Sequence, residues 1–412
     1  MDRRTFLKSA ATLSMSLLLP EAGAWAFSNP SGDNKKRLVV ILLRGAADGL
    51  NIVVPYGDPA YYQARSSIAV GKPGTESGVI DLDGNFGMHP ALAPLEPMWK
   101  SRNLAFVTSA GSPDPTRSHF DAQDYMESGV PGVKVVSTGW MNRLITLLPD
   151  NQSPVRALNF GPTVPRILSG PASVANVPTG AAAGRKLVVD RPAIAQAFQQ
   201  LYGKRDDALG KAFREGMEAR QTLSKELSDE MEAANKGAPS PKDIPNFGKE
   251  LAKLMTKDQT VQVAFIAFGG WDTHINQGAG KGQLANHLLP LAQGLADLVN
   301  GLGPIYKETN IVVMSEFGRT AHENGNGGTD HGHGNTMWVM GGDVHGGKVY
   351  GKYDSMASSD LYEGRDLPVS TDFRSVLSSV LVAHMGLHSP QMEKIFPNFN
   401  GGRSDVANII NA

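Results

Sequence analysis

The sequence has 412 residues, of which 41% are hydrophobic and 19% charged, so it can bury a large core as one domain with insertions or as two domains. Its 39 basic and 40 acidic residues leave a formal net charge of −1 and form no basic stripe, which argues against a nucleic-acid-binding protein. There is no cysteine, which excludes disulfides, thiolate metal sites, iron-sulfur clusters and thiol nucleophiles.

The first 26 residues have the pattern of an export signal. Arg3 and Arg4 form a twin-arginine pair, residues 10–19 are mildly apolar, and a small-residue cleavage site ends at Ala26. The apolar stretch is shorter than the roughly 20 residues that a membrane-spanning helix needs. The segment resembles a signal for the Tat translocase, which would be the partner during export. We therefore predict cleavage after Ala26 and a periplasmic or secreted mature protein that does not span a membrane.

The mature chain begins with a continuous apolar run at residues 37–43, which predicts a parallel strand buried on both faces. The run leads into a turn that contains Asp48. In open α/β sheets, ligands bind at the carboxyl ends of the strands, so Asp48 is placed where a site would form. An Asp-Gly pair is also a common turn, and both interpretations of Asp48 stay open. A hairpin is expected at 81–85, and a helix at 91–100 follows His89, which is expected to be structural.

A second core strand is predicted at residues 104–108, and the helix that follows it begins after Ser118. Ser118 fits an N-cap, with Asp121 three residues later as in a loose capping box. A hydroxyl at a helix N-terminus also lies in a positive field where phosphate or sulfate can bind. As a nucleophile, Ser118 would need a base or a metal ion to activate it, and Arg117 and His119 flank it. The capping and the nucleophilic interpretations both stay open.

At about residues 190–258 the composition shifts to Ala, Gln, Glu, Lys and Arg with helical spacing, which predicts a helical insertion. A further core strand is predicted at 261–268, and it ends in the sequence GGWDTH. In an extended or loop conformation, Asp272 and His274 point to the same side of the chain. Again an acidic and an imidazole donor come directly after a strand.

The densest group of potential metal ligands lies between two short apolar runs, at residues 311–314 and 336–340, that predict buried strands. The glycine-rich loop between these runs carries five donors: Glu316, His322, Asp330, His331 and His333. Nitrogen and oxygen donors suit zinc, manganese or iron better than calcium. We predict a metal site here, against the alternative of a polar surface loop. Helices are expected at 284–302 and 373–385, and the residues after 396 are expected to form a tail.

Donors therefore follow several predicted strands, and the carboxyl ends of parallel strands meet at one edge of a sheet. Two cation sites a few ångströms apart at that edge would clamp a transferring phosphoryl or sulfuryl group and activate a hydroxyl nucleophile. The strand ends and the last helix carry six motifs: RGAADGLN, RSHFDAQD, GGWDTH, SEFGRT, GTDHGHGNTMWVMGG and TDFRSVL. Together, these motifs resemble domain-of-unknown-function family 1501, a Tat-exported bacterial branch of the alkaline phosphatase and sulfatase superfamily.

The resemblance implies a fold and two metal sites. The fold would be an alkaline phosphatase-like three-layer α/β sandwich around a mostly parallel sheet, formed as a single domain by residues 27–412. One divalent ion would be held by Asp48 and Glu316. The other would be held by Asp272, His274 and His331. The ions implied are zinc or manganese, with calcium as a further option.

The resemblance also implies the catalytic residues. Ser118 would be the nucleophile that bridges the two ions, and His119 and Arg319 would assist it. Phosphatases of the superfamily place an Asp-His pair where this chain has Glu316 and Phe317, so one imidazole ligand is either missing or supplied by His333 or His119.

Two functions follow as hypotheses. The first is an exported metal-dependent hydrolase that acts on a phosphate or sulfate-type ester of a small molecule or a glycan, which Arg117 and Arg319 favour. The second is a non-catalytic periplasmic or secreted binding or assembly protein that retains the fold, which the missing Asp-His pair favours. A cysteine-dependent sulfatase is excluded because the chain has no cysteine.

Overall fold

A computed structural model describes residues 36–149, 153–161, 163–177, 244–399, 401 and 406–411, together with isolated positions between 196 and 210. The predicted export signal lies outside the described residues. Most of the predicted helical insertion also lies outside them, and its last part forms α9 (Ile244–Lys257). Within the described ranges, no helix is both long and apolar enough to cross a bilayer.

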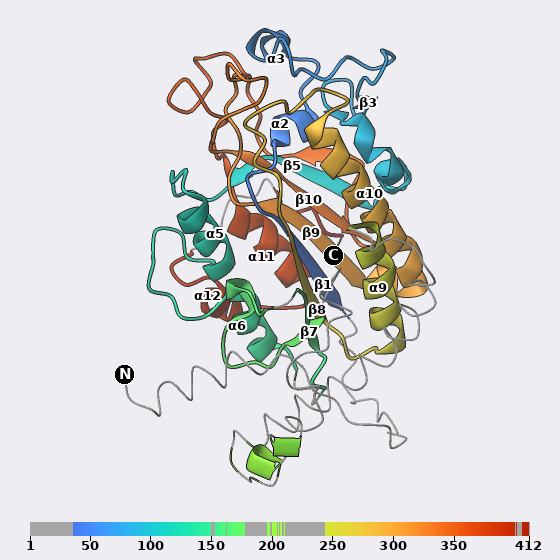
Figure 1. The fold of residues 1–412 in the computed structure, drawn as a ribbon, viewed down its shortest axis with the longest axis vertical. Helices are drawn as coiled ribbons and strands as arrows, with labels where there is room; N and C mark the ends of the chain where they lie inside the picture. The colour runs from blue at the N-terminus through green and yellow to red at the C-terminus, as the bar shows by residue number, and fades with distance from the viewer. Residues whose placement is uncertain are drawn as a thin grey trace.

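The core of the molecule is a nine-stranded sheet (Figure 1). At its centre, β1 (Arg37–Leu43) lies between β8 (Val263–Phe268) and β9 (Thr309–Ser315) and runs parallel to both. Beyond β9, β10 (Asn335–Gly341) runs antiparallel to β9 and to β5 (Leu104–Gly111). The other pairings are parallel and add four short strands: β6 (Ala157–Phe160), β7 (Ala175–Val177), β11 (Lys348–Tyr350) and β12 (Thr371–Asp372). The predicted α/β fold with a mostly parallel sheet is confirmed.

Helices cover both faces of this sheet, because successive side chains of each strand point to opposite faces. In β1, Val39 and Ile41 belong to one apolar core and Val40 and Leu42 to the other, and all four are fully buried. The first core is closed by α9, α10 (Gln283–Leu302) and the 3₁₀ helix η1 (Pro90–Leu95). The second is closed by α5 (His119–Ser128), α6 (Trp140–Leu147), α11 (Phe373–Ala383) and α12 (Ser389–Ile395). The result is the expected three-layer arrangement (Figure 1).

The remaining elements are short. The predicted hairpin is confirmed as part of a small antiparallel sheet of β2 (Val53–Val54), β4 (Gly87–Met88) and β3 (Ile80–Asp81). The single helix predicted at 91–100 is instead divided into η1 and α4 (Glu96–Lys100), because Pro94 and Pro97 lack the N–H that a continuous helix needs. The other short helices are α2 (Gly49–Ile52), α3 (Pro59–Ala64), η2 (Arg166–Leu168) and η5 (Gly303–Glu308).

The C-terminal residues do not form a tail, and that prediction was wrong. Val406, Ile409 and Ile410 are buried in the same core as α11 and α12. The backbone of Ile409 accepts a hydrogen bond of 2.8 Å from His345 N. These three apolar residues are spaced so that they lie on one side of a single turn. The short segment 406–411 can therefore pack that side against the core.

The topology brings the predicted strand ends to one edge of the sheet. Leu43 pairs with Phe268 on one side and with Ser315 on the other, so β1, β8 and β9 end together. Because β10 is antiparallel to its neighbours, it begins at this edge, and its first residue, Asn335, pairs with Ala110 near the end of β5. The loops that follow β1, β5, β8 and β9 therefore meet there.

Candidate metal centre

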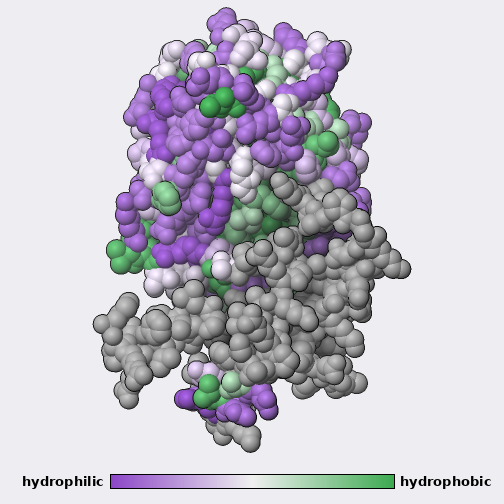
Figure 2. Space-filling model, in the orientation of Figure 1, coloured by the Kyte–Doolittle hydropathy of each residue, from purple (hydrophilic) through white to green (hydrophobic). Residues whose placement is uncertain are grey.

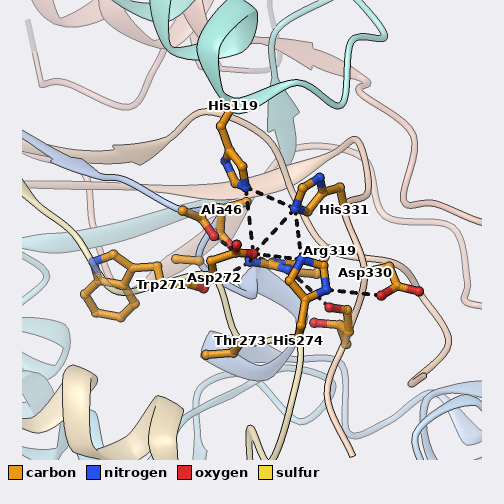
Figure 3. Close-up of polar contacts among 12 residues, drawn as sticks. Ala46, His119, Trp271, Asp272, Thr273, His274, Arg319, Asp330 and His331 are labelled. Atoms are coloured by element: carbon orange, nitrogen blue, oxygen red, sulfur yellow. Dashed lines mark hydrogen bonds and ion pairs between the residues drawn. The ribbon is translucent and has the colours of Figure 1, made fainter. Parts of the chain in front are cut away.

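Four side chains from three of these loops converge on one point (Figure 3). His119 is the first residue of α5, Asp272 and His274 follow β8, and His331 lies in the loop between β9 and β10. The Nε2 atom of His331 is 3.0 Å from the Nε2 atom of His119 and 3.0 Å from that of His274. The Oδ1 atom of Asp272 lies 3.0, 3.4 and 3.7 Å from the Nε2 atoms of His274, His331 and His119.

These separations fit a metal ion. With zinc-ligand distances of roughly 2.0–2.2 Å, the donor atoms of a tetrahedral site lie about 3.3–3.6 Å apart. Within the described ranges, one group of His, Asp and Glu residues has all its donor atoms within 4.8 Å of one another, and it consists of His119, Asp272 and His331. His274 adds a fourth donor through its contacts with Asp272 and His331.

The outer nitrogen of each ring fixes its tautomer. The Nδ1 atoms of His119, His274 and His331 face Glu316 Oε1 at 2.8 Å, Asp330 Oδ1 at 3.1 Å and the carbonyl oxygen of Arg117 at 3.0 Å. Carboxylates and carbonyls only accept, so each Nδ1 carries the hydrogen and each neutral ring presents an Nε2 lone pair to the centre. Three lone pairs and a carboxylate oxygen repel one another unless a cation, or protons in the metal-free protein, lies between them. Such outer partners are typical of histidine metal ligands.

Glu316 orients His119 and does not have the surroundings expected of a metal ligand. It is fully buried, and its Oε1 atom accepts hydrogen bonds from His119, from Gly45 N at 2.8 Å and from Gln123 Nε2 at 2.9 Å. Gln123 is held in turn by Arg44 at 2.8 Å. Burial raises the pKa of Glu316, but the hydrogen bonds from His119 and Gln123 outweigh burial and leave the pKa below its usual value.

Arg319 orients Asp272. The guanidinium is fully buried, with Nη2 at 2.5 Å from Asp272 Oδ1 and at 2.6 Å from the carbonyl of Gly45, and Nε at 2.7 Å from the carbonyl of Ala46. Burial alone raises the pKa of Asp272, but the hydrogen bond and charge of Arg319 leave the pKa below its usual value. Arg319 therefore favours the ionised form of Asp272 and positions it, and the predicted catalytic role of Arg319 stays a prediction.

The turn after β1 forms hydrogen bonds with both side chains that orient the ligands, Glu316 and Arg319. It donates Gly45 N to Glu316 and offers the carbonyls of Gly45 and Ala46 to Arg319. Both turn residues have positive φ angles, 112° and 57°. A Cβ atom on Gly45 would lie 2.7 Å from the backbone nitrogen of Asp272, so a side chain there would displace the ligand loop. Arg44, Gly45 and Gln123 were not predicted as site residues, although a glycine two residues after a core strand was a usable signal.

Asp48 lies in a separate, fully buried ion pair. Its Oδ2 atom is 2.5 Å from Arg65 Nη1 and 2.6 Å from Gln277 Nε2. A guanidinium therefore occupies the position beside Asp48 where the sequence predicted a second cation. The Oε1 atom of Glu316 likewise accepts from three N–H donors, and the predicted metal site of Asp48 and Glu316 stays a prediction.

His333 is not part of the group of donor atoms at the centre. The His333 ring is buried and packs on Tyr362 at 4.9 Å between ring centres, and burial lowers its pKa. Ser118 is the N-cap of α5, as one interpretation predicted, and its Oγ atom accepts from Asp121 N at 3.5 Å. Its role as a nucleophile stays a prediction. His89 is structural, as expected: it is buried and caps η1 through Ala91 N.

A protein-family model described as "Protein of unknown function (DUF1501)" matches residues 99–396. The chain belongs to the DUF1501 family. No curated protein matches this member of the family.

Several solved structures share a distant likeness with the chain. The C-terminal periplasmic domain of EcEptC from Escherichia coli is 11% identical with a TM-score of 0.39, over 93% of this chain and 92% of that one. PsFucS1 sulfatase from Pseudoalteromonas sp. is 14% identical with a TM-score of 0.39, over 91% and 72%. A protein in the alkaline phosphatase superfamily from Vibrio parahaemolyticus is 10% identical with a TM-score of 0.35, over 85% and 72%. This likeness is too low to assign the roles of individual residues.

Metal affinity is expected to increase with pH, because Nε2 must lose its proton before it binds a cation. The hydrogen bond to Glu316 raises the pKa of His119 above 6.5, so protons compete with the metal up to a higher pH than for an ordinary histidine.

The variant Glu316→Gln keeps an acceptor for His119 Nδ1 but removes the negative charge. It should move the midpoint of the affinity-pH curve to lower pH and weaken binding about 10- to 100-fold at pH 8. Chelator competition between pH 5.5 and 8.5 measures both effects, and an unchanged midpoint would show that Glu316 does not control His119.

Proposed function

We propose that the protein is an exported hydrolase of phosphate or sulfate-type esters that uses one divalent metal ion, held by His119, Asp272, His274 and His331. The observation that carries this proposal is that His331 Nε2 and Asp272 Oδ1 lie 3.4 Å apart and each within 3.7 Å of the Nε2 atoms of His119 and His274. A set of three nitrogen donors and one oxygen donor suits zinc or manganese. The twin-arginine segment supports export through the Tat translocase.

The centre is accessible to a substrate. The side chains of His119, His274 and His331 are 24%, 37% and 27% exposed, and that of Asp272 is 45% exposed. A divalent ion held there would polarise an ester oxygen and stabilise the charge that develops on it. The chain's own contribution is to hold three neutral rings and one ionised carboxylate in place, through Glu316, Asp330 and Arg319.

Ser118 is the proposed nucleophile. It directly precedes the ligand His119 and lies at the N-terminus of a ten-residue helix, where the backbone N–H groups favour an anionic ester. Activation of its hydroxyl would come from the metal, because a serine is a weak nucleophile without a base or a metal ion.

The second candidate is a non-catalytic binding or assembly protein with a structural metal ion. One observation favours it: the number of protein donors here, four, is the number that structural zinc sites use. The hydroxyl of Ser118 is also already used to cap α5.

Substitution of Ser118 separates the two candidates. If Ser118 is the nucleophile, Ser118→Ala should nearly abolish ester hydrolysis while metal content and folding persist, and Ser118→Asp should not restore activity. If it only caps α5, Ser118→Ala should lower the free energy of unfolding by roughly 0.5–2 kcal/mol and Ser118→Asp should restore it. The assay is turnover of phosphate mono- and diesters and sulfate esters with added zinc, manganese or calcium. Equal rates in all three proteins would reject the nucleophile, and no turnover by the wild type would favour the binding protein.

A further inference from the structure

We propose that the centre prefers esters with a single negative charge, such as phosphodiesters and sulfate monoesters, over doubly charged phosphate monoesters, because its carboxylates leave no net positive charge around a bound divalent ion. This inference rests on the proposed function and narrows its substrate class. It follows from the charges that surround the four donors.

The charged side chains that contact the three histidine rings, or that contact one another beside them, are mostly acidic. Asp272 is a donor, Glu316 bonds to His119, and Asp330 bonds to His274. The positive group among them is Arg319, which is fully buried. Three carboxylates against one guanidinium leave a net charge of −2, since an imidazole that binds a metal ion through Nε2 is neutral. A divalent cation brings this sum to zero and not to a positive value.

Two further arginines beside the centre are already neutralised. Arg117, whose carbonyl holds His331, ion-pairs with Asp366 at 2.6 Å and with Glu363 at 2.7 Å. Arg365 donates to the carbonyl of His331 at 2.9 Å and pairs with the same Asp366 at 3.1 Å. These two guanidinium groups therefore face two carboxylates and add no net charge.

The buried ion pair of Asp48 and Arg65 also adds no positive charge that a substrate could reach. Beside Asp48, the positive charge belongs to Arg65, and both side chains have 0% exposure, so this charge is out of reach of a substrate. The carboxylates that an incoming ester meets are those of Asp272 and Asp330, which are 45% and 52% exposed. Each repels a dianion more strongly than a monoanion.

The test uses three esters that share the same leaving group, 4-nitrophenolate: 4-nitrophenyl phosphate, bis(4-nitrophenyl) phosphate and 4-nitrophenyl sulfate. At pH 8 the first is doubly charged, since the second pKa of a phosphate monoester is about 6. With the metal-loaded mature protein, kcat/KM for one or both singly charged esters should exceed that for the monoester by about tenfold or more, a preference of the size that a single unfavourable charge contact gives. Equal or faster turnover of the monoester would overturn the inference.

Failure of the proposed function gives a different result. If none of the three esters is hydrolysed, the hydrolase proposal fails, but charge preference is still measurable as binding. Calorimetry of the metal-loaded protein with diphenyl phosphate and phenyl phosphate at pH 8 should then give tighter binding of the singly charged anion. Tighter binding of phenyl phosphate would overturn the charge argument on its own.

A charge variant tests the cause. Asp330→Asn keeps an oxygen that accepts from His274 Nδ1 but removes one exposed negative charge, so the preference for singly charged esters or anions should fall by at least about threefold. The matched control is Glu308→Gln, which removes the same charge at the opposite end of β9, about 25 Å from the centre at roughly 3.3 Å per residue. It should leave the preference unchanged. An equal effect of both variants, or no effect of Asp330→Asn, would contradict a local charge mechanism.

Discussion

Replacement of His331 by alanine is expected to weaken metal binding by more than the roughly 10- to 100-fold that follows loss of an outer hydrogen-bond partner. The reason is geometric: His331 Nε2 lies within 3.4 Å of a donor atom from each of the other three residues. Without it, the donors on α5 and those after β8 no longer surround one point. Elemental analysis after dialysis should find about one equivalent of metal in the wild type and almost none in the variant.

The matched control for this experiment is His345→Ala. His345 is an exposed histidine in the turn after β10, outside the donor group, and the substitution removes the same imidazole from the chain. Its metal content should equal that of the wild type. If His331→Ala retained the wild-type stoichiometry, His331 would not be a ligand and the proposed centre would be wrong.

Replacement of Arg65 by methionine is expected to lower the free energy of unfolding by about 3–5 kcal/mol, because it leaves the charge of Asp48 buried without a cationic partner. Both side chains have 0% exposure, and Arg65 also donates to the carbonyls of Ala321 at 2.9 Å and Thr320 at 2.7 Å. The measurement is urea unfolding of the metal-free protein. The double variant Arg65→Met/Asp48→Asn should recover part of the loss, because the uncompensated charge is gone.

An exposed pair supplies the comparison. Lys352 and Asp354 form an ion pair of 2.7 Å with side chains 60% and 47% exposed. Lys352→Met should change the free energy of unfolding by no more than about 1 kcal/mol. Equal effects of Arg65→Met and Lys352→Met would show that the buried pair is not a structural anchor.

The strands could be predicted because parallel strands that are buried on both faces have continuous apolar sequences. The run at 37–43 has the bounds of β1, and the runs at 104–108 and 261–268 fall on β5 and β8. The rule that ligands gather at the carboxyl ends of strands also brought Asp272 and His274 to the same edge as His331, which is where the structure places them. The family was likewise recognised from the order of short motifs, and the family model confirms it.

The supporting contacts could not be predicted, because they depend on tertiary geometry. Arg65 and Asp48 are 17 residues apart and belong to different elements, so no local pattern signals their ion pair. The roles of Glu316 and His119 could not be separated either, since a carboxylate and an imidazole can each be a metal ligand or the outer partner of one. Only the position of α5 relative to β9 shows that the His119 ring points its Nε2 to the centre and its Nδ1 to Glu316.

The most direct test of the metal centre is anomalous diffraction from crystals of the mature protein loaded with zinc or manganese. One anomalous peak is predicted per chain, at about 2.0–2.2 Å from the Nε2 atoms of His119, His274 and His331 and from Asp272 Oδ1. Arg65 should remain paired with Asp48, with no peak beside that carboxylate. A second peak between Asp48 and Glu316, or no peak among the three rings, would contradict the single centre described for this protein.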